Sequence, residues 1–578
     1  MLIKSTDLIA LLPFFVALVA ATVVILVDVF HRTDKPRAYV AHIATAGMVL
    51  TLASVWYMHG NVEAGPAFGK LIYHDGFSTF LNALFVLAAI LTIMVSPRYL
   101  REHGAERGEY YALIILATTG MMLMAAAGDL LMVFLGLEIM SIAIYVLVGF
   151  FRADGKSAEA ATKYFFLGAF ASAIFLYGMA LIYGTTGGTS LEGIAAAVRA
   201  SASSGDNVLV HMTDDVNATS TLDPLFYIGC LMLLVGMAFK VALVPFHMWT
   251  PDAYTGAPSS TVGFMATAVK AAAFAALIRL VFIGLGVEAT RIDSQGWVKM
   301  LFYLSIITII VGNLMAIVQT NVKRMLAYSS IAHAGYATIG LVAAGYTGAG
   351  AGISGYAGAS SVLFYLLTYT FATLGAFGVL SYLGNRHREV TTYDDLSGLG
   401  YKYPAIGFIL VVFMLSSAGI PPTAGFVGKF HVFRTAIVAG EISGDNSFIW
   451  LVAIAFMASV AGAYYYLRVV VHLYMKESNG EVPVLRSKLT GFALAISAFF
   501  TLLIGVYPTP FIEIASDAMK DFQGVEVAYG PQGETRAAGL NVLPEEDAAK
   551  VEANTIRIDP IVAPMPDQAP ESHDGHGH

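Results

Sequence analysis

The chain has 578 residues, of which 57% are hydrophobic and 12% are charged, and its mean hydropathy is +0.70. Soluble domains carry roughly 25% charged residues, so this composition excludes a water-soluble fold. The formal net charge of −8 at pH 7 gives no basic surface of the kind that binds nucleic acid. Apolar runs of about twenty residues favour a polytopic all-α membrane protein over a β-barrel, whose strands alternate over about ten residues.

Fourteen apolar runs are long enough to cross about 30 Å of hydrocarbon. The first has no small-residue cleavage site after it, so we expect it to be retained as a helix. The runs cover residues 8–28, 38–58, 76–96, 110–127, 130–150, 160–184, 224–244, 257–283, 298–318, 324–345, 357–383, 404–437, 448–475 and 488–508.

The basic residues of the loops predict the orientation. With the N-terminus outside, sixteen Lys and Arg residues fall in inner loops and four in outer loops, so the positive-inside rule favours fourteen helices with both termini outside. The outer four are Lys70, Arg199, Arg291 and Lys299. The inner sixteen are Arg32, Lys35, Arg37, Arg98, Arg101, Arg107, Arg152, Lys156, Lys323, Arg324, Arg386, Arg388, Lys402, Lys476, Arg486 and Lys488.

Two prolines suggest an internal repeat. Pro245 interrupts the seventh apolar run and Pro421 interrupts the twelfth, and a proline inside a helix frees a backbone carbonyl. Units of five helices would be inverted relative to each other, because an odd number of crossings reverses the second copy. The predicted parts are helices 1–3 in residues 1–109, a first five-helix unit in 110–283, a second in 298–475, helix 14 in 488–510 and a tail in 511–578.

Two polar segments lie outside the spans. Residues 185–223 are rich in Gly, Ser and Thr and are expected to form a flexible outer loop. The acidic tail ends in "SHDGHGH", and its composition predicts disorder or loose packing. We interpret its histidines as solvated rather than as metal ligands.

Ionisable residues occur inside the apolar runs, where a charge costs several kcal/mol. Lys163 could reach the inner surface by snorkelling, His333 could be a hydrogen-bonded core residue, and His247 could satisfy carbonyls freed by Pro245. Glu138 requires a cation, which a lysine of another helix can supply. The full set is Glu138, Lys163, Lys240, Lys270, Lys429, His247 and His333.

These residue types suit proton transfer. A desolvated ammonium releases its proton more readily than one in water, and a nearby carboxylate restores the charged form. A Glu–Lys pair that forms and breaks would therefore switch the next lysine. The broken helices would admit water at the depth of these side chains, so the charges and the breaks predict a hydrated path.

Three motifs carry a family resemblance: "PFHMWTPDAYTGAP" (245–258), "QTNVKRMLAYSSIAHAGY" (319–336) and "GIPPTAGFVGKF" (419–430). They resemble the antiporter-like membrane subunits of respiratory complex I over residues 1 to 510. The form of the first motif is most similar to that of subunit N, the equivalent of mitochondrial subunit 2. Lys429 argues against subunit M, which typically has a glutamate there, and the missing lateral helix argues against subunit L.

The resemblance implies a fourteen-helix fold with two inverted five-helix repeats, discontinuous helices 7 and 12, and proton translocation without a redox centre in this chain. It implies a pair of Glu138 on helix 5 with Lys240 on helix 7, a central Lys270 on helix 8, and Lys429 on helix 12 facing the outer exit. Lys163, His247 and His333 match the family's lysine of helix 6 and histidines of helices 7 and 10.

The resemblance also implies a setting for the chain. We expect a non-redox subunit of a proton-translocating NADH:quinone oxidoreductase in the inner (plasma) membrane, with both termini on the periplasmic side. Its partners would be a neighbouring subunit M, small subunits of the K, J and A types, and membrane lipids, with FMN, iron–sulfur clusters and quinone in partner subunits. The alternative is a subunit of a multisubunit cation/proton antiporter. The sequence leaves H⁺ and Na⁺ open as the transported ion.

Overall fold

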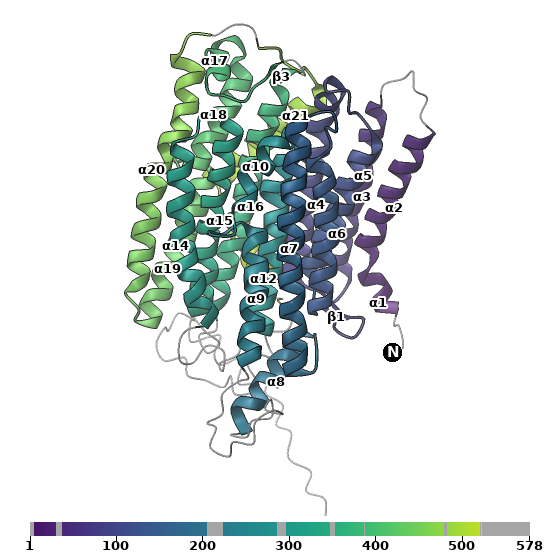
Figure 1. Ribbon diagram of the computed structural model, residues 1–578, viewed down its shortest axis with the longest axis vertical. Coiled ribbons are helices and arrows are strands. Elements are labelled where there is room, and N and C mark those ends of the chain that lie inside the picture. Colours follow the sequence, from purple (N-terminus) through teal and green to yellow (C-terminus); the bar gives the residue numbers. More distant parts are fainter. Residues whose placement is uncertain are drawn as a thin grey trace, which may run out of the picture. The chain divides into compact units, whose positions relative to one another are not determined.

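The computed structural model describes residues 5–30, 37–204, 224–285, 296–346, 353–385, 388–478, 482–520 and 522. Residues 1–530 and 531–578 form two separate units, and the second unit lies outside the described residues. Within the first unit long helices run side by side (Figure 1), and short strands form two antiparallel hairpins.

The helices of the first half follow the predicted spans closely. They are α1 (Ser5–Ala10), α2 (Leu12–Val29), α3 (Ala38–Asn61), α4 (Gly76–Glu102), α5 (Gly108–Ala126), α6 (Leu130–Val148), α7 (Gly155–Thr186), α8 (Leu191–Ser204), α9 (Pro224–Val241), α10 (Trp249–Gly256), α11 (Ser259–Phe264), the π-helix η1 (Met265–Val269), α12 (Lys270–Arg279) and the π-helix η2 (Leu280–Gly284). One hairpin, β1 (Gly65–Ala67) and β2 (Ile72–His74), precedes α4.

The second half has the same character. Its helices are α14 (Gly296–Ile317), α15 (Val322–Tyr346), α16 (Ile353–Tyr382), the 3₁₀-helix η3 (Asp394–Leu396), α17 (Leu399–Lys402), α18 (Pro404–Ala418), α19 (Ala424–Ser443), α20 (Ser447–Met475), α21 (Lys488–Val506) and α22 (Thr509–Lys520). The second hairpin is β3 (Gly384–Asn385) and β4 (Arg388–Glu389). It lies at the opposite end of the bundle from β1 and α8 (Figure 1). We call the end that holds β1, β2 and α8 the hairpin end.

Twelve helices in the described part of the chain are long and apolar enough to cross a membrane. The chain is therefore a multi-pass membrane protein, as its composition predicts. The other two predicted spans correspond to α15 and to the α18–α19 pair, which are not among the twelve. α18 has only 15 residues, and α19 carries Lys429, Arg434 and Glu441. A count of fourteen crossings remains a prediction.

Both predicted helix interruptions are confirmed. Residues 242–248 separate α9 from α10, and residues 419–423 separate α18 from α19. α18 ends where Gly419 takes a positive φ of 84°, a conformation that a residue without a Cβ adopts at no steric cost. Each interruption contains a proline, Pro245 or Pro421, whose nitrogen cannot continue the helical hydrogen bonds.

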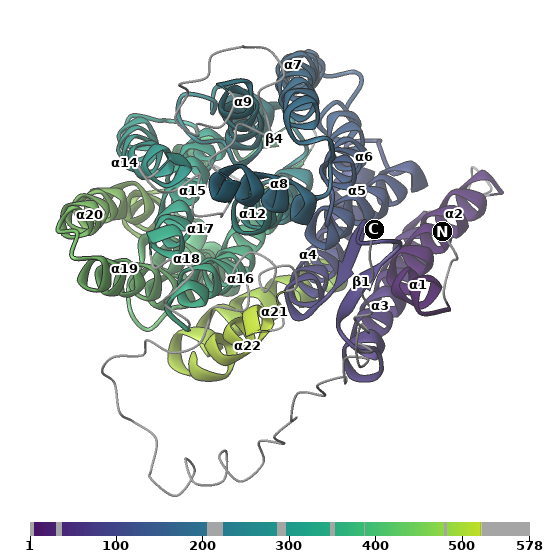
Figure 2. The same ribbon diagram turned by 90° about the horizontal axis from the view of Figure 1, so that it is seen from below.

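Two helices form the centre of the bundle. One is the segment from Ser259 to Gly284, which runs through α11, η1, α12 and η2. Its most apolar window is 100% buried, and the most apolar window of Ala357–Tyr382 is 94% buried. In contrast, Ser447–Met475 is only 22% buried. Seen along the helices (Figure 2), α12 and α16 lie among the other helices, while α2, α3 and α20 lie at the edges.

Acidic caps set the starts of three spans. The Asp75 side chain accepts a hydrogen bond from the Ser78 N–H at the start of α4, and Asp129 and Asp154 do the same for the N–H groups of Leu131 and Lys156 in α6 and α7. These caps satisfy N–H groups that the first turn of a helix leaves free.

Two segments are more ordered than the sequence indicates. Part of the predicted loop 185–223 forms α8, which buries Leu191, Ile194 and Val198, and residues 205–223 lie outside the described residues. The predicted tail begins with α22, which packs against α4 and α16 and buries Ala515, Ala518 and Met519. In both helices small and apolar residues recur at helical spacing, and this periodicity outweighs the polar composition.

Candidate functional site

Lys240 occupies the last turn of α9, immediately before the first interruption. Its side chain is 2% exposed, and its Nζ atom donates hydrogen bonds to Ser141 Oγ at 2.7 Å and to the Tyr145 hydroxyl at 3.5 Å. The ammonium also lies 5.7 Å from the centre of the Tyr145 ring, within the range of a cation–π interaction. Two side chains of α6 therefore bind this lysine.

Glu138 lies one turn before Ser141 on α6. Its Oε1 atom is buried and has no hydrogen-bond partner among the described residues, and no ion pair within 4 Å joins it to Lys240 there. The direct pair predicted from the resemblance is thus not formed in this conformation. Ser141, rather than the Glu138 carboxylate, is the side chain of α6 that lies within hydrogen-bonding distance of the Lys240 ammonium.

Lys270 is the first residue of α12 and directly follows the π-helix η1. A π-turn shifts the side chains after it relative to a regular helix, and such turns are frequent at functional sites. The Lys270 side chain is 2% exposed, and its Nζ atom donates to the Ser330 carbonyl oxygen of α15 at 2.8 Å. Lys240 and Lys270 share no hydrogen-bonding partner among the described residues.

His333 lies one turn after Ser330 on α15 and is 5% exposed. Its Nδ1 atom is 2.6 Å from the Tyr365 hydroxyl, and its Nε2 atom is 3.0 Å from the Tyr466 hydroxyl. Tyr466 in turn shares a hydrogen bond with Ser329. Helices α15, α16 and α20 therefore meet at one imidazole, and both ring nitrogens belong to a chain of hydroxyl groups.

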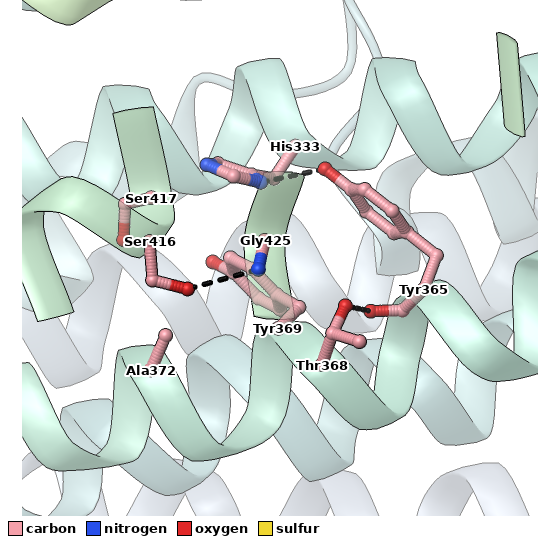
Figure 3. A pocket seen from close by; sticks show the side chains of 8 residues that line it. All are labelled: His333, Tyr365, Thr368, Tyr369, Ala372, Ser416, Ser417 and Gly425. Atoms are coloured by element: carbon pink, nitrogen blue, oxygen red, sulfur yellow. Dashed lines mark hydrogen bonds between the residues drawn. The ribbon is translucent and has the colours of Figure 1, made fainter. Parts of the chain in front are cut away.

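A small cavity adjoins His333 (Figure 3) and reaches the second interruption. Its size is of the order of a single water molecule, and hydroxyl-bearing side chains are among the residues around it. The N–H of Gly425 donates to Ser416 Oγ at 3.0 Å across the interruption. A Cβ atom at position 425 would lie 1.9 Å from the Ser416 carbonyl oxygen, so this approach of α19 to α18 requires glycine. The lining residues are His333, Tyr365, Thr368, Tyr369, Ala372, Ser416, Ser417 and Gly425.

Lys429 binds the interruption itself. Its Nζ atom donates to the carbonyl oxygens of Ser417 at 2.9 Å and Ala418 at 3.2 Å, and to Ser459 Oγ at 2.9 Å. The side chain is 6% exposed, and the ammonium lies 5.0 Å from the centre of the Tyr336 ring. The ammonium thus satisfies carbonyls that the end of α18 leaves without N–H partners.

His247 lies within the first interruption and is half-buried. Its Nδ1 atom is buried and makes no hydrogen bond in the described part of the protein. The carbonyl of Phe239, at the start of this interruption, accepts from the Ala242 N–H at 3.1 Å and from the indole N–H of Trp249 at 3.0 Å. The imidazole is therefore not used to satisfy this carbonyl.

Lys163 lies apart from the buried lysines. Its side chain is 49% exposed on α7 and pairs with Glu159 at 2.7 Å and with Asp252 at 3.1 Å. Asp252, from the segment after the first interruption, also binds Arg324 of α15 at 2.8 Å. One carboxylate thus joins elements of the two predicted repeats. The sequence offered Asp252 within the first motif, but spacing alone gave it no role.

A cluster of polar side chains around Glu389 lies next to Arg324, at the end of the bundle opposite the hairpin end. The Tyr99 hydroxyl donates to Glu389 Oε1 at 2.8 Å, and Lys323 Nζ lies 3.5 Å from Glu389 Oε2. His103 Nε2 lies 3.2 Å from the same carboxylate. The Lys323 ammonium holds the pKa of Glu389 well below its usual range, because the positive charge favours the ionised form.

The polar partners of the site residues were not predicted. The hydroxyl groups of Ser141, Tyr365, Tyr466 and Ser459 each contact a predicted site residue, and Ser330 does so through its backbone carbonyl. Their signal in the sequence is weak, since serine and tyrosine are common in apolar helices and only the packing decides which of them face a lysine. A further buried charge, Arg279, stands in the apolar run "ALIRLVF" and was visible to the same argument that singled out the lysines.

Comparison with known proteins places this site in a family. Residues 127–462 match the family described as NADH:quinone oxidoreductase/Mrp antiporter, transmembrane, and this match spans both interruptions as well as Lys240, Lys270 and Lys429. The chain belongs to this family. It is 39% identical over 520 residues to the NADH-quinone oxidoreductase subunit N of Trichlorobacter lovleyi, covering 90% of this chain and 98% of that protein.

Solved structures agree with the fold. A chain of respiratory complex I from Thermus thermophilus is similar at 33% identity with a TM-score of 0.68, covering 87% of this chain and 99% of that one. A chain of the Mrp complex from Dietzia sp. DQ12-45-1b has a TM-score of 0.71 at 20% identity, covering 91% and 98%. The second likeness concerns the fold alone.

Proposed function

We propose that the chain is a proton-translocating membrane subunit of an NADH:quinone oxidoreductase, of the subunit N type. One observation carries the proposal beyond family membership. Lys240, Lys270 and Lys429 are buried, each stands beside a helix interruption or a π-turn, and each donates to neutral oxygen atoms of another element. Dipoles rather than a fixed counter-charge compensate these ammonium groups, so a proton can be exchanged without breaking an ion pair.

The path we propose has two parts. Glu138 and Lys240 form the first, where movement of the Glu138 carboxylate toward the ammonium, in place of Ser141, would make and break the switching pair. Lys270, His333 and Lys429 form the second, in which the Tyr365 and Tyr466 hydroxyls and water in the cavity relay the proton. Water would join the two parts, because Lys240 and Lys270 share no partner among the described residues.

Two residues act at the margins of this path. His247 has an unpartnered nitrogen beside the first interruption, where it would pass protons between water and Lys240. Lys163 is exposed and paired with Asp252, so we assign it a supporting role on the uptake side rather than a central one. Lys429, whose ammonium faces the second interruption, would release protons to the outer side.

The rest of the enzyme would lie in partner subunits. We place the chain in the inner membrane with both termini on the periplasmic side, beside a subunit M and small subunits of the K, J and A types. FMN, iron–sulfur clusters and the quinone site would belong to the partners, and this chain would act as a non-redox translocase. Electron transfer elsewhere would drive the proton movement here.

Purification through a tag on this chain tests the proposal. The expected result is a complex with flavin, iron–sulfur absorbance and NADH:quinone activity, which acidifies or alkalinises sealed vesicles during turnover. Replacing Na⁺ by choline in the medium separates proton from sodium transport. Isolation of a complex without flavin that exchanges Na⁺ for H⁺ across vesicles would instead identify a cation/proton antiporter.

A further inference from the structure

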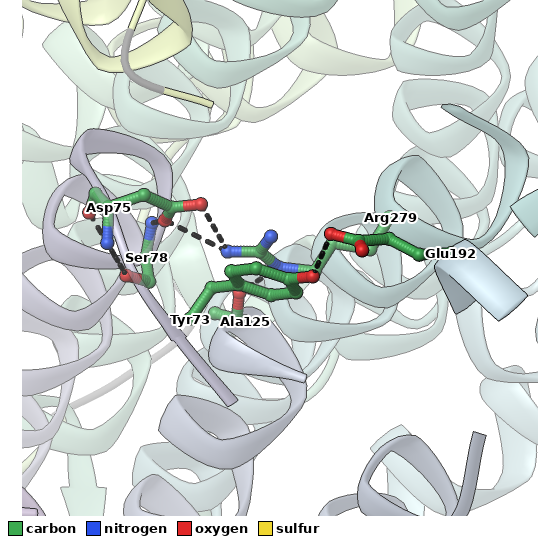
Figure 4. A network of polar contacts seen from close by, with 6 residues as sticks. All are labelled: Tyr73, Asp75, Ser78, Ala125, Glu192 and Arg279. Atoms are coloured by element: carbon green, nitrogen blue, oxygen red, sulfur yellow. Dashed lines mark hydrogen bonds and ion pairs between the residues drawn. The ribbon is translucent and has the colours of Figure 1, made fainter. Parts of the chain in front are cut away.

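Arg279 is a buried charge that the proposed proton path does not use. It is 0% exposed at the end of α12 (Figure 4), and its Nη2 atom donates to both carboxylate oxygens of Asp75 at 2.8 Å. Its Nε atom donates to the Ala125 carbonyl at 2.6 Å. The side chain thus ties α12 to the start of α4 and to the last turn of α5. Three charge-assisted contacts, two to Asp75 and one to Ala125, therefore hold the guanidinium in place.

Three aromatic rings surround the guanidinium. Its central carbon lies 5.5 Å from the Tyr73 ring, 5.0 Å from the Phe77 ring and 5.1 Å from the Phe522 ring. Phe77 and Phe522 also pack edge to face at 5.0 Å, and all three side chains are buried. We call these three residues the aromatic lid. It brings together the hairpin, α4 and the residue that follows α22.

A second layer of contacts supports the lid. The Tyr73 hydroxyl donates to Glu192 of α8, and Lys70 of the hairpin pairs with the same carboxylate (Figure 4 shows the tyrosine contact). The burial and the Glu192 contact raise the pKa of Tyr73 above its usual value, so the hydroxyl keeps its proton. Segments from three distant parts of the sequence, residues 70–77, Glu192 and Phe522, therefore close over Arg279.

Arg279 and Lys270 are the two ends of the same helix, α12, with a π-turn beyond each. Nine residues of α-helix place their backbones about 13 Å apart. Arg279 thus stands between the central lysine and the hairpin end. An arginine does not give up its proton at accessible pH, so this position cannot relay one. A fixed guanidinium in a dry setting opposes the passage of cations.

We propose that Arg279, Asp75 and the aromatic lid form a plug that prevents protons on Lys270 from escaping through the hairpin end of the central helix. The inference rests on the proposed function, because it assumes that Lys270 exchanges protons. It assigns Arg279 as a positioning residue that directs protons from Lys270 toward His333 and Lys429. In this proposal the segment after α21 covers the plug through Phe522.

The test is passive proton leak. The whole complex carrying Arg279→Gln is reconstituted in sealed vesicles, and proton uptake is followed with a pH dye under a potassium diffusion potential, without NADH. We expect uptake several-fold faster than in the unchanged complex, with NADH:quinone electron transfer retained. Retention of an entrapped dye checks that the vesicles are intact. A variant that assembles with lower thermal stability and no added leak would show a purely structural pair and overturn the plug.

Phe522→Ala keeps the ion pair and removes one ring of the lid, so it decides the matter even if the Arg279 variant fails to assemble. It should leak less than Arg279→Gln but more than its matched control, Phe511→Ala. Phe511 lies in α22, the helix that precedes Phe522, but packs against Phe500. Equal leak from both variants would mean that loosening α22, rather than uncovering Arg279, opens the path. The leak is read without turnover, so absence of NADH-driven transport in the unchanged complex would refute the proposed function alone.

Discussion

The Nζ atom of Lys429 lies 2.9 Å from the carbonyl oxygen of Ser417, across the interruption that divides their helix. Ser417 belongs to the last turn of α18. The N–H of Gly419 caps the carbonyls of Leu415 and Ser416, whereas the Ser417 carbonyl accepts from the lysine. The negative end of the α18 dipole therefore faces the ammonium. The buried charge and the broken helix stabilise each other, which explains why an apolar segment contains both.

Lys429→Ala removes this contact and the exchangeable proton together. Loss of a positioned proton donor slows a transfer step by about 10²-fold or more, so NADH-driven proton uptake by vesicles should fall while electron transfer becomes slower or uncoupled. The measurement is the ratio of protons moved to NADH oxidised in the assembled complex. A ratio equal to that of the unchanged complex would remove Lys429 from the path.

Ser459→Ala is the matched control for Lys429. It deletes one of three hydrogen bonds to the ammonium, that of Ser459 Oγ at 2.9 Å, and leaves both carbonyl contacts. A neutral hydrogen bond contributes only about 1 kcal/mol. The variant should therefore retain most of the proton transport, and a loss as large as that of Lys429→Ala would point to a distorted interruption rather than to the missing ammonium.

Lys240→Ala should lower proton transport while the protein still inserts and assembles. Ser141 and Tyr145, which bind the ammonium, can turn to each other or to water after the change, so neither hydroxyl has to remain without a partner. Glu138 loses the lysine toward which we propose that it moves. The readouts are the amount of assembled complex and the initial rate of proton uptake, and normal uptake in a fully assembled complex would contradict the assignment.

Lys163→Ala provides the contrast to Lys240. The Lys163 side chain is 49% exposed, and water screens exposed ion pairs so that they contribute little. Asp252 keeps its other partner, Arg324, at 2.8 Å. We therefore expect proton transport to fall much less than in Lys240→Ala, and an equal loss in the two variants would place Lys163 in the path itself.

His333→Leu should interrupt the second part of the path. The substitution leaves the Tyr365 hydroxyl without its imidazole partner and separates it from Tyr466. Proton uptake should fall about as far as in the Lys429 variant, since both break the same series of groups. Tyr365→Phe keeps the ring and the Tyr466 contact of His333, so its effect should be smaller. The reverse order would indicate that the tyrosine, not the histidine, carries the proton.

The sequence was sufficient to locate the buried lysines, because an ammonium inside an apolar run has no common structural explanation. It also located both interruptions, since proline cannot continue the hydrogen bonds of a helix. The partners of the lysines could not be predicted. Ser141 and Glu138 lie on the same side of α6. Which of them contacts Lys240 is set by tertiary packing, so the sequence alone does not decide between them.

Lys163 and Arg279 show that a charged residue inside an apolar run can be either exposed or buried. Both stand in apolar runs, yet Lys163 is exposed beside Glu159, one turn earlier on α7, while Arg279 is fully buried. Depth along the sequence does not give depth within the bundle, because a helix such as α7 has one face against its neighbours and one face outward. The partner of Arg279, Asp75, is 204 residues away, a separation that no local pattern can bridge.

Glu389→Gln should destabilise the end of the bundle opposite the hairpin end. The Lys323 ammonium, which is 3% exposed, loses its charged partner, and an unsatisfied buried polar group costs about 1–3 kcal/mol. We expect the low end of this range, because the Glu389 side chain is itself 34% exposed. The measurement is Tm of the purified complex, with Glu102→Gln as the control, because Glu102 pairs with Arg98 nearer the surface.

The pH dependence of the stability lost in Glu389→Gln follows from the lowered pKa of Glu389. A carboxyl group whose pKa is depressed on folding contributes its full stabilisation above its ordinary value of about 4.3 and loses it as the pH falls through the folded-state value. The difference in Tm between the unchanged protein and Glu389→Gln should therefore not shrink as the pH falls from about 8 to 5. A difference that shrinks as the pH falls through this interval would mean that the carboxylate is protonated there and that Lys323 does not hold its charge.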